Sequence, residues 1–240
     1  MLNETLLLLS VGIGFVASHL ILSGSIRSII ITAVGSRGYF LIFSTISVLL
    51  LSFFIIAYSE FPRYAYLWEP RLIFLWTPLF FMSLSTVLLV GAFLHTSTKV
   101  ETFIGNELEN VERRPLFTGV YRITRHPVQW AIMLWAASHL VANGDLMSVI
   151  FFGSFFLLSS LGTILSDQKK SKRYPAAWRI ISYHTSNLPF LAILKRRTQL
   201  KFRELWGALV IGLVILAAFL FGHVYLSGVS VSPIYFSISF

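Results

Sequence analysis

Histidine is the residue type in this chain best suited to chemistry, and two of the six histidines lie inside long apolar runs. His19 and His139 each follow a serine and are otherwise surrounded by apolar residues. An ionisable side chain inside hydrocarbon is costly, so it marks a functional site by default. Two interpretations stay open for each ring: it hydrogen-bonds a neighbouring helix, or it binds a metal or haem iron. Because the chain has no cysteine, disulfides and thiolate ligands are excluded.

The densest polar motif is TGVYRITRHP, residues 118–127, which contains Arg125 and His126 and ends in proline. Proline is well tolerated as the first residue of a helix. Two arginines and a histidine before a helix can hold an anion or a polar head group, whereas arginines that only snorkel would anchor the chain at an interface. Trp130 shares a helical face with His126, but His139 lies 13 residues further on and faces elsewhere. The two histidines are therefore expected to have different roles.

The elements that carry these residues are apolar enough to cross a membrane. Residues of the AVILMFWYC set make up 56% of the 240 residues, 12% are charged, and mean hydropathy is +0.77. A soluble domain carries about 25% charged residues, so a soluble enzyme is excluded, and disorder is excluded by the same hydrophobicity. A bilayer-spanning helix needs about 20 apolar residues. Six runs approach this length: residues 5–22, 39–59, 72–94, 128–143, 146–166 and 205–226. We predict an all-α, polytopic membrane helix bundle with six transmembrane helices.

Polar residues mark the ends of these runs. Gly144 suits the left-handed conformation that ends a helix, and Asp145 favours a helix start, which predicts a tight hairpin between the fourth and fifth runs. Asp167 follows the fifth run beside Lys169 and Lys170. We expect it to form a solvated ion pair there, worth well under about 1 kcal/mol.

The basic residues are distributed unevenly between the loops. Loops after the first, third and fifth runs hold 17 Lys and Arg, and the opposite side holds the other two, Arg63 and Arg71. This bias predicts that the basic loops are cytoplasmic and both termini lie outside. The formal net charge of +9 then faces anionic lipid, and a nucleic-acid partner is not expected. The expected location is a bacterial inner membrane, with the lipid bilayer as partner.

The predicted spans also set the depths of the two intramembrane histidines. From the midpoints of their runs, His19 lies roughly 6 Å towards the cytoplasm and His139 roughly 5 Å towards the outside. An offset of about 11 Å is large for one small metal ion. A haem between two rings separates their backbones more, so this spacing permits haem without requiring it.

Five short motifs together resemble the NnrU family, which includes the plant 15-cis-zeta-carotene isomerase. They are Gly35-x-Arg-Gly-Tyr39, Arg125-His-Pro-x-x-Trp130, Leu134-Trp-Ala-x-x-His139, Ala142-Asn-Gly-Asp145 and Thr185-Ser-Asn-x-Pro-Phe190. The resemblance covers residues 12–194, and residues 205–226 add a C-terminal helix to a single domain of residues 1–240.

The resemblance implies a multi-pass membrane protein, associated in bacteria with denitrification and nitric-oxide metabolism. In the isomerase branch it implies a haem b held by two histidines, which match His19 and His139, and a redox change that frees an iron site for a cis double bond. Arg125, His126 and Trp130 are the other candidates for cofactor contact. This chain is closer to the bacterial branch, because it has Gln129 and no additional histidine in the fifth run.

Three functions follow as hypotheses, and whether the protein is an enzyme stays open. The first is a haem-binding redox protein or an isomerase of a hydrophobic small molecule. The second is a non-enzymatic accessory or regulatory protein of nitrogen-oxide respiration. The third rests on a distant similarity of residues 119–127 to isoprenylcysteine carboxyl methyltransferases, which implies S-adenosylmethionine binding. That family has a Glu-Glu pair where this chain has Ser166-Asp167.

Overall fold

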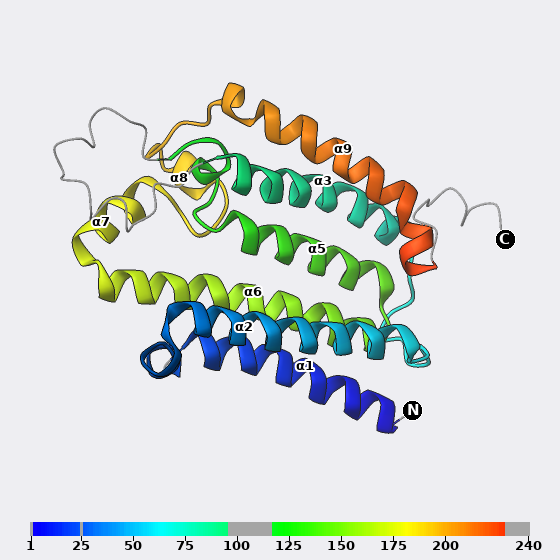
Figure 1. Cartoon of the computed structure of the whole chain (residues 1–240). Helices are drawn as coiled ribbons and strands as arrows, with labels where there is room; N and C mark the ends of the chain where they lie inside the picture. The colour runs from blue at the N-terminus through cyan, green and yellow to red at the C-terminus, as the bar shows by residue number, and fades with distance from the viewer. Residues whose placement is uncertain (1, 25, 96–116, 229–240) are drawn as a thin grey trace. The chain divides into compact units, whose positions relative to one another are not determined.

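The described part of the chain is helical, as predicted. The computed structural model describes residues 2–24, 26–95 and 117–228. Within these ranges the structure contains no strand, and an isolated bridge pairs Tyr66 with Asp145. The elements are α1 (Leu2–Ser23), α2 (Ile26–Glu60), α3 (Leu72–Leu94), η2 (Gly119–Arg122), α5 (Pro127–Asn143), α6 (Leu146–Arg173), α7 (Pro175–His184), α8 (Leu191–Leu194) and α9 (Phe202–Ser227) (Figure 1).

Five of the described helices, α1, α2, α3, α6 and α9, are long and apolar enough to cross a membrane. Their outward side chains are large and apolar: Phe40, Phe93 and Phe221 expose 67%, 81% and 82% of their surface. Such exposure would be unfavourable in water and is natural in lipid. The helices therefore indicate an integral membrane protein. Helix α5 has 17 residues and is not one of the five. Six passes and external termini stay predictions.

Helix α2 begins earlier than the predicted second span, which started at residue 39. Its first part, from Ile26, joins the second across Gly35, whose φ of 73° and ψ of 171° are not helical. Glycine is the residue that adopts a positive φ without steric cost. The Tyr39 hydroxyl donates to the Leu22 carbonyl oxygen over 3.2 Å, which ties the second part of α2 to the end of α1.

The chain divides into two compact units, of which the first comprises Met1–Pro78 and Ala136–Ser159. Leu8 of α1 and Phe54 of α2 are fully buried in it. A Cβ on Gly12 would lie 2.7 Å from Ser154 Oγ, so a glycine here lets α1 approach α6 closely.

The hairpin between α5 and α6 belongs to this first unit and was predicted. Gly144 has a φ of 72°, and a Cβ there would overlap the Trp68 carbonyl oxygen. Asp145 is 1% exposed, and its Oδ1 accepts the Ser148 N–H at 2.8 Å. This bond caps α6, because the first N–H groups of a helix have no partner inside the helix.

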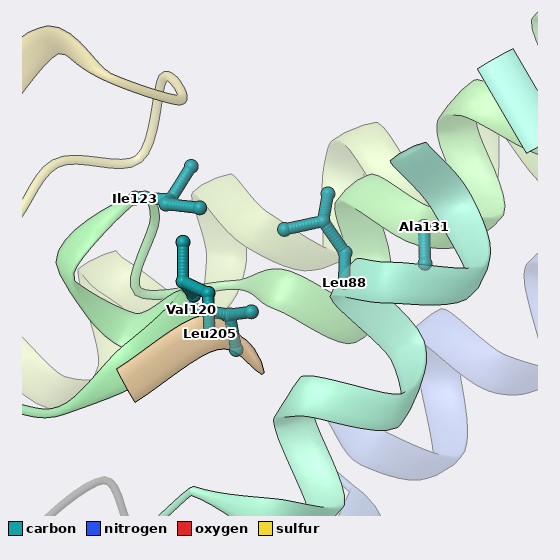
Figure 2. Close-up of a cluster of buried hydrophobic side chains, with 5 residues drawn as sticks. All are labelled: Leu88, Val120, Ile123, Ala131 and Leu205. Atoms are coloured by element: carbon teal, nitrogen blue, oxygen red, sulfur yellow. The ribbon is translucent and has the colours of Figure 1, made fainter. Parts of the chain in front are cut away.

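The second unit comprises Leu79–Trp135 and Ser160–Phe240. Its buried apolar cluster draws one or two residues from each of α3, the η2 region, α5 and α9: Leu88, Val120, Ile123, Ala131 and Leu205 (Figure 2). Two glycines allow neighbouring segments of this unit to approach each other closely. A Cβ on Gly91 would overlap the Val120 side chain, and one on Gly212 would lie 3.1 Å from the Val87 backbone. Small residues at such contacts are typical of membrane helix packing.

Candidate functional sites

His19 lies in the first unit, four residues before Ser23, the last residue of α1. Its Nδ1 is 2.8 Å from the carbonyl oxygen of Phe15, one turn earlier. A carbonyl oxygen only accepts hydrogen bonds, so Nδ1 donates in this contact, and the neutral tautomer that makes it has its lone pair on Nε2. The Phe15 ring lies 4.6 Å from the imidazole and the Phe43 ring 5.5 Å away. The result is an oriented imidazole in apolar surroundings.

His139 lies in the same unit, on α5. Its ring stacks on Phe152 of α6, with centroids 5.0 Å apart and planes inclined by 28°. Ser138 Oγ is 3.4 Å from Nδ1, at the long end of the hydrogen-bond range. His126, which directly precedes α5, belongs to the second unit, and the different roles of the two histidines stay a prediction.

A path of phenylalanine rings connects the two intramembrane histidines. Phe15, beside His19, contacts Phe155, which contacts Phe151, and Phe151 contacts Phe152, beside His139. Each of these centroid distances is 5.2 Å. Two histidines that held one haem iron would both have to reach it. His19 by itself would be able to hold such an iron through Nε2, because Nδ1 is bonded to a carbonyl oxygen. The pair fits one iron only if the phenylalanines between the two rings repack.

No group of three or more His, Cys, Asp and Glu that could hold a metal ion occurs among the described residues. This finding concerns sites built wholly from protein ligands. A haem needs only one or two protein ligands, so haem binding does not require such a group.

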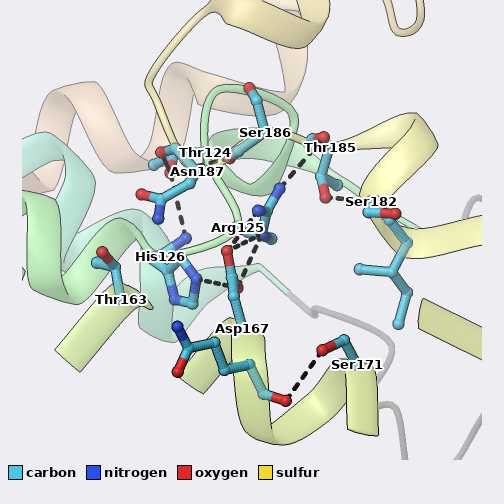
Figure 3. A network of polar contacts seen from close by, with 12 residues as sticks. Thr124, Arg125, His126, Thr163, Asp167, Ser171, Ser182, Thr185, Ser186 and Asn187 are labelled. Carbon is cyan, nitrogen blue, oxygen red and sulfur yellow. Dashed lines mark hydrogen bonds and ion pairs between the residues drawn. The ribbon is translucent and has the colours of Figure 1, made fainter. Parts of the chain in front are cut away.

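The second unit holds a compact polar cluster in which one carboxylate accepts hydrogen bonds from an arginine and a histidine side chain (Figure 3). Arg125 Nε lies 3.0 Å from both oxygens of Asp167, and Arg125 Nη2 also donates to Oδ2. His126 Nε2 lies 2.7 Å from Asp167 Oδ1 and donates to it. His126 is 3% exposed, and the side chain of Asp167 is 15% exposed. We call these three residues the Arg–His–Asp cluster.

The prediction that Asp167 pairs with Lys169 or Lys170 in solvent was wrong about its environment and its main partners. Proline at position 127 starts α5 and thereby places Arg125 and His126 just before the first helical turn, beside the last turns of α6. The carboxylate is largely enclosed there. The ion pair with Arg125 and the hydrogen bond from His126 compensate for the hydration that the carboxylate loses.

The same chain segment also binds the loop that follows α7. The Arg125 N–H donates to the Ser186 carbonyl oxygen at 3.0 Å, and Thr124 Oγ1 donates to the Asn187 carbonyl oxygen at 2.6 Å. The Trp130 indole N–H donates to Asn187 Oδ1 at 3.3 Å. The Arg125 guanidinium further lies over the Trp178 ring, 5.1 Å from its centroid. The predicted residues Arg125, His126 and Trp130 are thus brought together.

A second ionic contact, which the sequence did not indicate, joins η2 to the start of α9. Arg122 Nε and Nη2 donate to the two oxygens of Glu204, at 2.8 and 3.1 Å, and the Gly119 N–H donates to Oε2 at 2.7 Å. His95 Nδ1 lies 2.8 Å from the Gly91 carbonyl oxygen, and Nε2 lies 2.6 Å from that of Glu204. The sequence signal was weak: Glu204 is the acidic residue next to the last apolar run.

The polar side chains of the two units differ in whether they could bind a ligand. The Arg–His–Asp cluster is closed, because the carboxylate is occupied by its own neighbours and the guanidinium also faces the Thr185 carbonyl oxygen at 3.4 Å. Its geometry suits a rigid joint. His19 instead combines a fixed orientation with a lone pair that a metal could use, in a span where polar groups are costly.

The sequence matches a known protein family over most of its length. The family described as NnrU protein matches residues 6–231, which include every helix of both units except a few terminal residues. This chain belongs to the NnrU family. The match extends beyond the residues that carried the resemblance and includes all of α9.

Among curated proteins, a partial similarity links this NnrU-family chain to a plant enzyme. It is 34% identical over 85 residues to the chloroplastic 15-cis-zeta-carotene isomerase of Zea mays. The aligned segment is 35% of this chain and 23% of the plant protein, so the chain spans less than a quarter of that relative's length. No solved structure matches.

Proposed function

We propose that this NnrU-family protein binds haem b through His19 and acts on an apolar molecule within the bilayer. The observation that carries the proposal is the bond between His19 Nδ1 and the Phe15 carbonyl oxygen, which leaves Nε2 as the ligating atom. Metal-binding histidines characteristically donate their other N–H in this way, which fixes the tautomer and the ring orientation. The similarity to a carotene isomerase supports an apolar, polyene-like substrate.

The residues around His19 and His139 would have distinct tasks. The Phe15 carbonyl oxygen holds the His19 ring, and the Phe15 and Phe43 rings exclude water from it. His139 is the proposed second ligand, after repacking of the phenylalanine rings described above. Bound haem would supply an iron whose redox state changes its affinity for a substrate double bond. The aromatic rings of this unit would present an apolar surface to such a substrate.

The proposal is tested by the haem content of the purified protein. Wild type, His19→Ala, His139→Ala and His223→Ala would be produced in haem-supplemented cells, purified in detergent and assayed for haem per chain after extraction. His223 is the matched control, because it is also in an apolar helix but belongs to the second unit. We expect haem in the wild type and in His223→Ala, and its loss in His19→Ala. Haem-free wild type would refute the proposal.

The type of reaction needs its own assay. Wild type carrying haem would be incubated with a cis polyene under reducing and oxidising conditions, and the isomers would be separated by chromatography. We expect conversion under one redox condition only, and none by His19→Ala. If haem binds but no polyene reacts, the nitrogen-oxide role remains as the alternative, and deletion of the gene should then lower nitrite or nitric-oxide reductase activity.

A further inference from the structure

A surface of the second unit that the proposed function does not use combines apolar tips with positive charge. It extends from the last turn of α6 through α7 and α8. Four large side chains expose about half of their surface or more: Tyr183 (59%), Leu188 (54%), Phe190 (44%) and Leu194 (76%). Exposed apolar clusters of this kind mark an interaction site. We call residues 172–196 the α7–α8 surface.

Basic residues flank these apolar residues on both sides along the chain. Residues 168–203 contain ten Lys and Arg and no Asp or Glu. Those exposed within the α7–α8 surface are Lys172, Arg173, Arg179, Lys195 and Arg196. On α7, Arg179 and Tyr183 are one helical turn apart, and Leu194 directly precedes two of the basic residues. The charge of the surface therefore complements a negatively charged partner.

The apolar tips are held in place by the buried side of the same segment. Ala177 and Ile181 of α7 are 6% and 5% exposed, so α7 has a buried face and a solvent-accessible one. Phe190 adopts a left-handed backbone with a φ of 64°, a costly conformation for a bulky residue. Its N–H donates to the Ile123 carbonyl oxygen at 2.9 Å, and Ser186 Oγ accepts the Ala192 N–H at 3.0 Å. The fold thus keeps a phenylalanine exposed at a conformational cost.

The partner within reach is lipid. Helix α6, one of the helices able to span a membrane, ends at Arg173, and α7 begins two residues later at Pro175. A segment so close to the end of a spanning helix lies at the level of the head groups. Amphipathic segments with basic polar faces bury their apolar side chains at the boundary between head groups and acyl chains. Anionic lipid contributes about 1 kcal/mol for each Lys or Arg near the surface, which is about fivefold in binding.

We propose that the α7–α8 surface binds the anionic phospholipid head groups of the bilayer that holds the chain, with Leu194 and Phe190 inserted among the acyl chains. The proposal is independent of haem binding. Because Thr185, Ser186 and Asn187 bind Thr124 and Arg125, the surface and the Arg–His–Asp cluster form one connected structure. Lipid contact at the surface would consequently stabilise that cluster.

The absence of cysteine makes site-specific labelling straightforward. Leu194→Cys would be labelled with an environment-sensitive fluorophore and the full-length protein placed in nanodiscs of phosphatidylcholine, with or without phosphatidylglycerol. Brominated lipids then report contact with acyl chains by quenching. The matched control is Gln199→Cys, an exposed polar position beyond α8. We expect strong quenching at position 194 with phosphatidylglycerol and little at 199. A label at 194 that stays in water in both lipid mixtures would overturn the proposal.

The charge requirement is tested separately by removing basic residues. Arg179→Gln and Lys195→Gln would each be combined with Leu194→Cys. The phosphatidylglycerol fraction that gives half-maximal quenching should rise about fivefold for each charge removed. Arg71→Gln, which removes an exposed charge outside the surface, should leave that fraction unchanged. Equal shifts for all three variants would overturn the proposal, as would quenching at position 194 that is the same with and without phosphatidylglycerol.

Discussion

Replacing Asp167 by asparagine tests the Arg–His–Asp cluster most sharply. The substitution conserves shape but removes the charge that Arg125 and His126 share. Both partners are enclosed: the Arg125 side chain is 15% exposed and His126 is 3% exposed. Breaking a buried ion pair by removing one partner costs roughly 3–5 kcal/mol, because the other charge stays buried without compensation. We expect about 3 kcal/mol, at the lower end, since Arg125 keeps its bond to the Thr185 carbonyl oxygen.

The assay is thermal unfolding of the detergent-purified protein. For a chain of this size each kcal/mol shifts Tm by about 2–4 °C, so Asp167→Asn should lower Tm by roughly 6–12 °C. Glu69→Gln, at an exposed carboxylate, should change stability by less than about 0.5 kcal/mol. Arg125→Met combined with Asp167→Leu should regain part of the loss, because neither member of the Arg125–Asp167 ion pair is then left buried without the other. A Tm for Asp167→Asn equal to that of the control would refute the cluster as a stabilising joint.

Two further predictions concern residues of the second unit. Gly119→Ala should destabilise the protein by about 1–3 kcal/mol, because Gly119 has a φ of 55° and a Cβ there would overlap the His95 ring. The control is Gly153→Ala, since no atom lies within 4 Å of a Cβ at that position. It should be neutral or stabilising in the same unfolding assay. S-adenosylmethionine should give no binding heat in calorimetry, because Arg125 and His126 are already bonded within the cluster; measurable heat would restore the methyltransferase hypothesis.

Features governed by neighbouring residues could be predicted from the sequence. The hairpin was predicted because Gly144 and Asp145 carry their own conformational signals, and the structure confirms both the left-handed glycine and the cap on Ser148. Family membership was equally accessible, because the motifs were specific in combination. The extension of α2 back to Ile26 was missed, since a glycine can either end a helix or connect two helical parts.

Features that depend on distant residues could not be predicted in the same way. Asp167 lies 41 residues from His126, and its real partners appear only when α5 and α6 pack. The contact between His95 and Glu204 spans 109 residues. The rings between His19 and His139 are phenylalanines, and with 22 phenylalanines in the chain their presence carries no signal about which of them touch. The partners of these side chains are therefore set by long-range packing, which residue spacing along the chain does not reveal.

The central claim is that His19 is oriented to bind haem iron, and the most direct measurement is the absorption spectrum of the purified protein, oxidised and reduced, for wild type and His19→Gln. Glutamine keeps similar size and polarity but lacks the imidazole. The account predicts a haem spectrum in the wild type that shifts on reduction and is absent or altered in the variant. A colourless wild type, or identical spectra for both proteins, would contradict it.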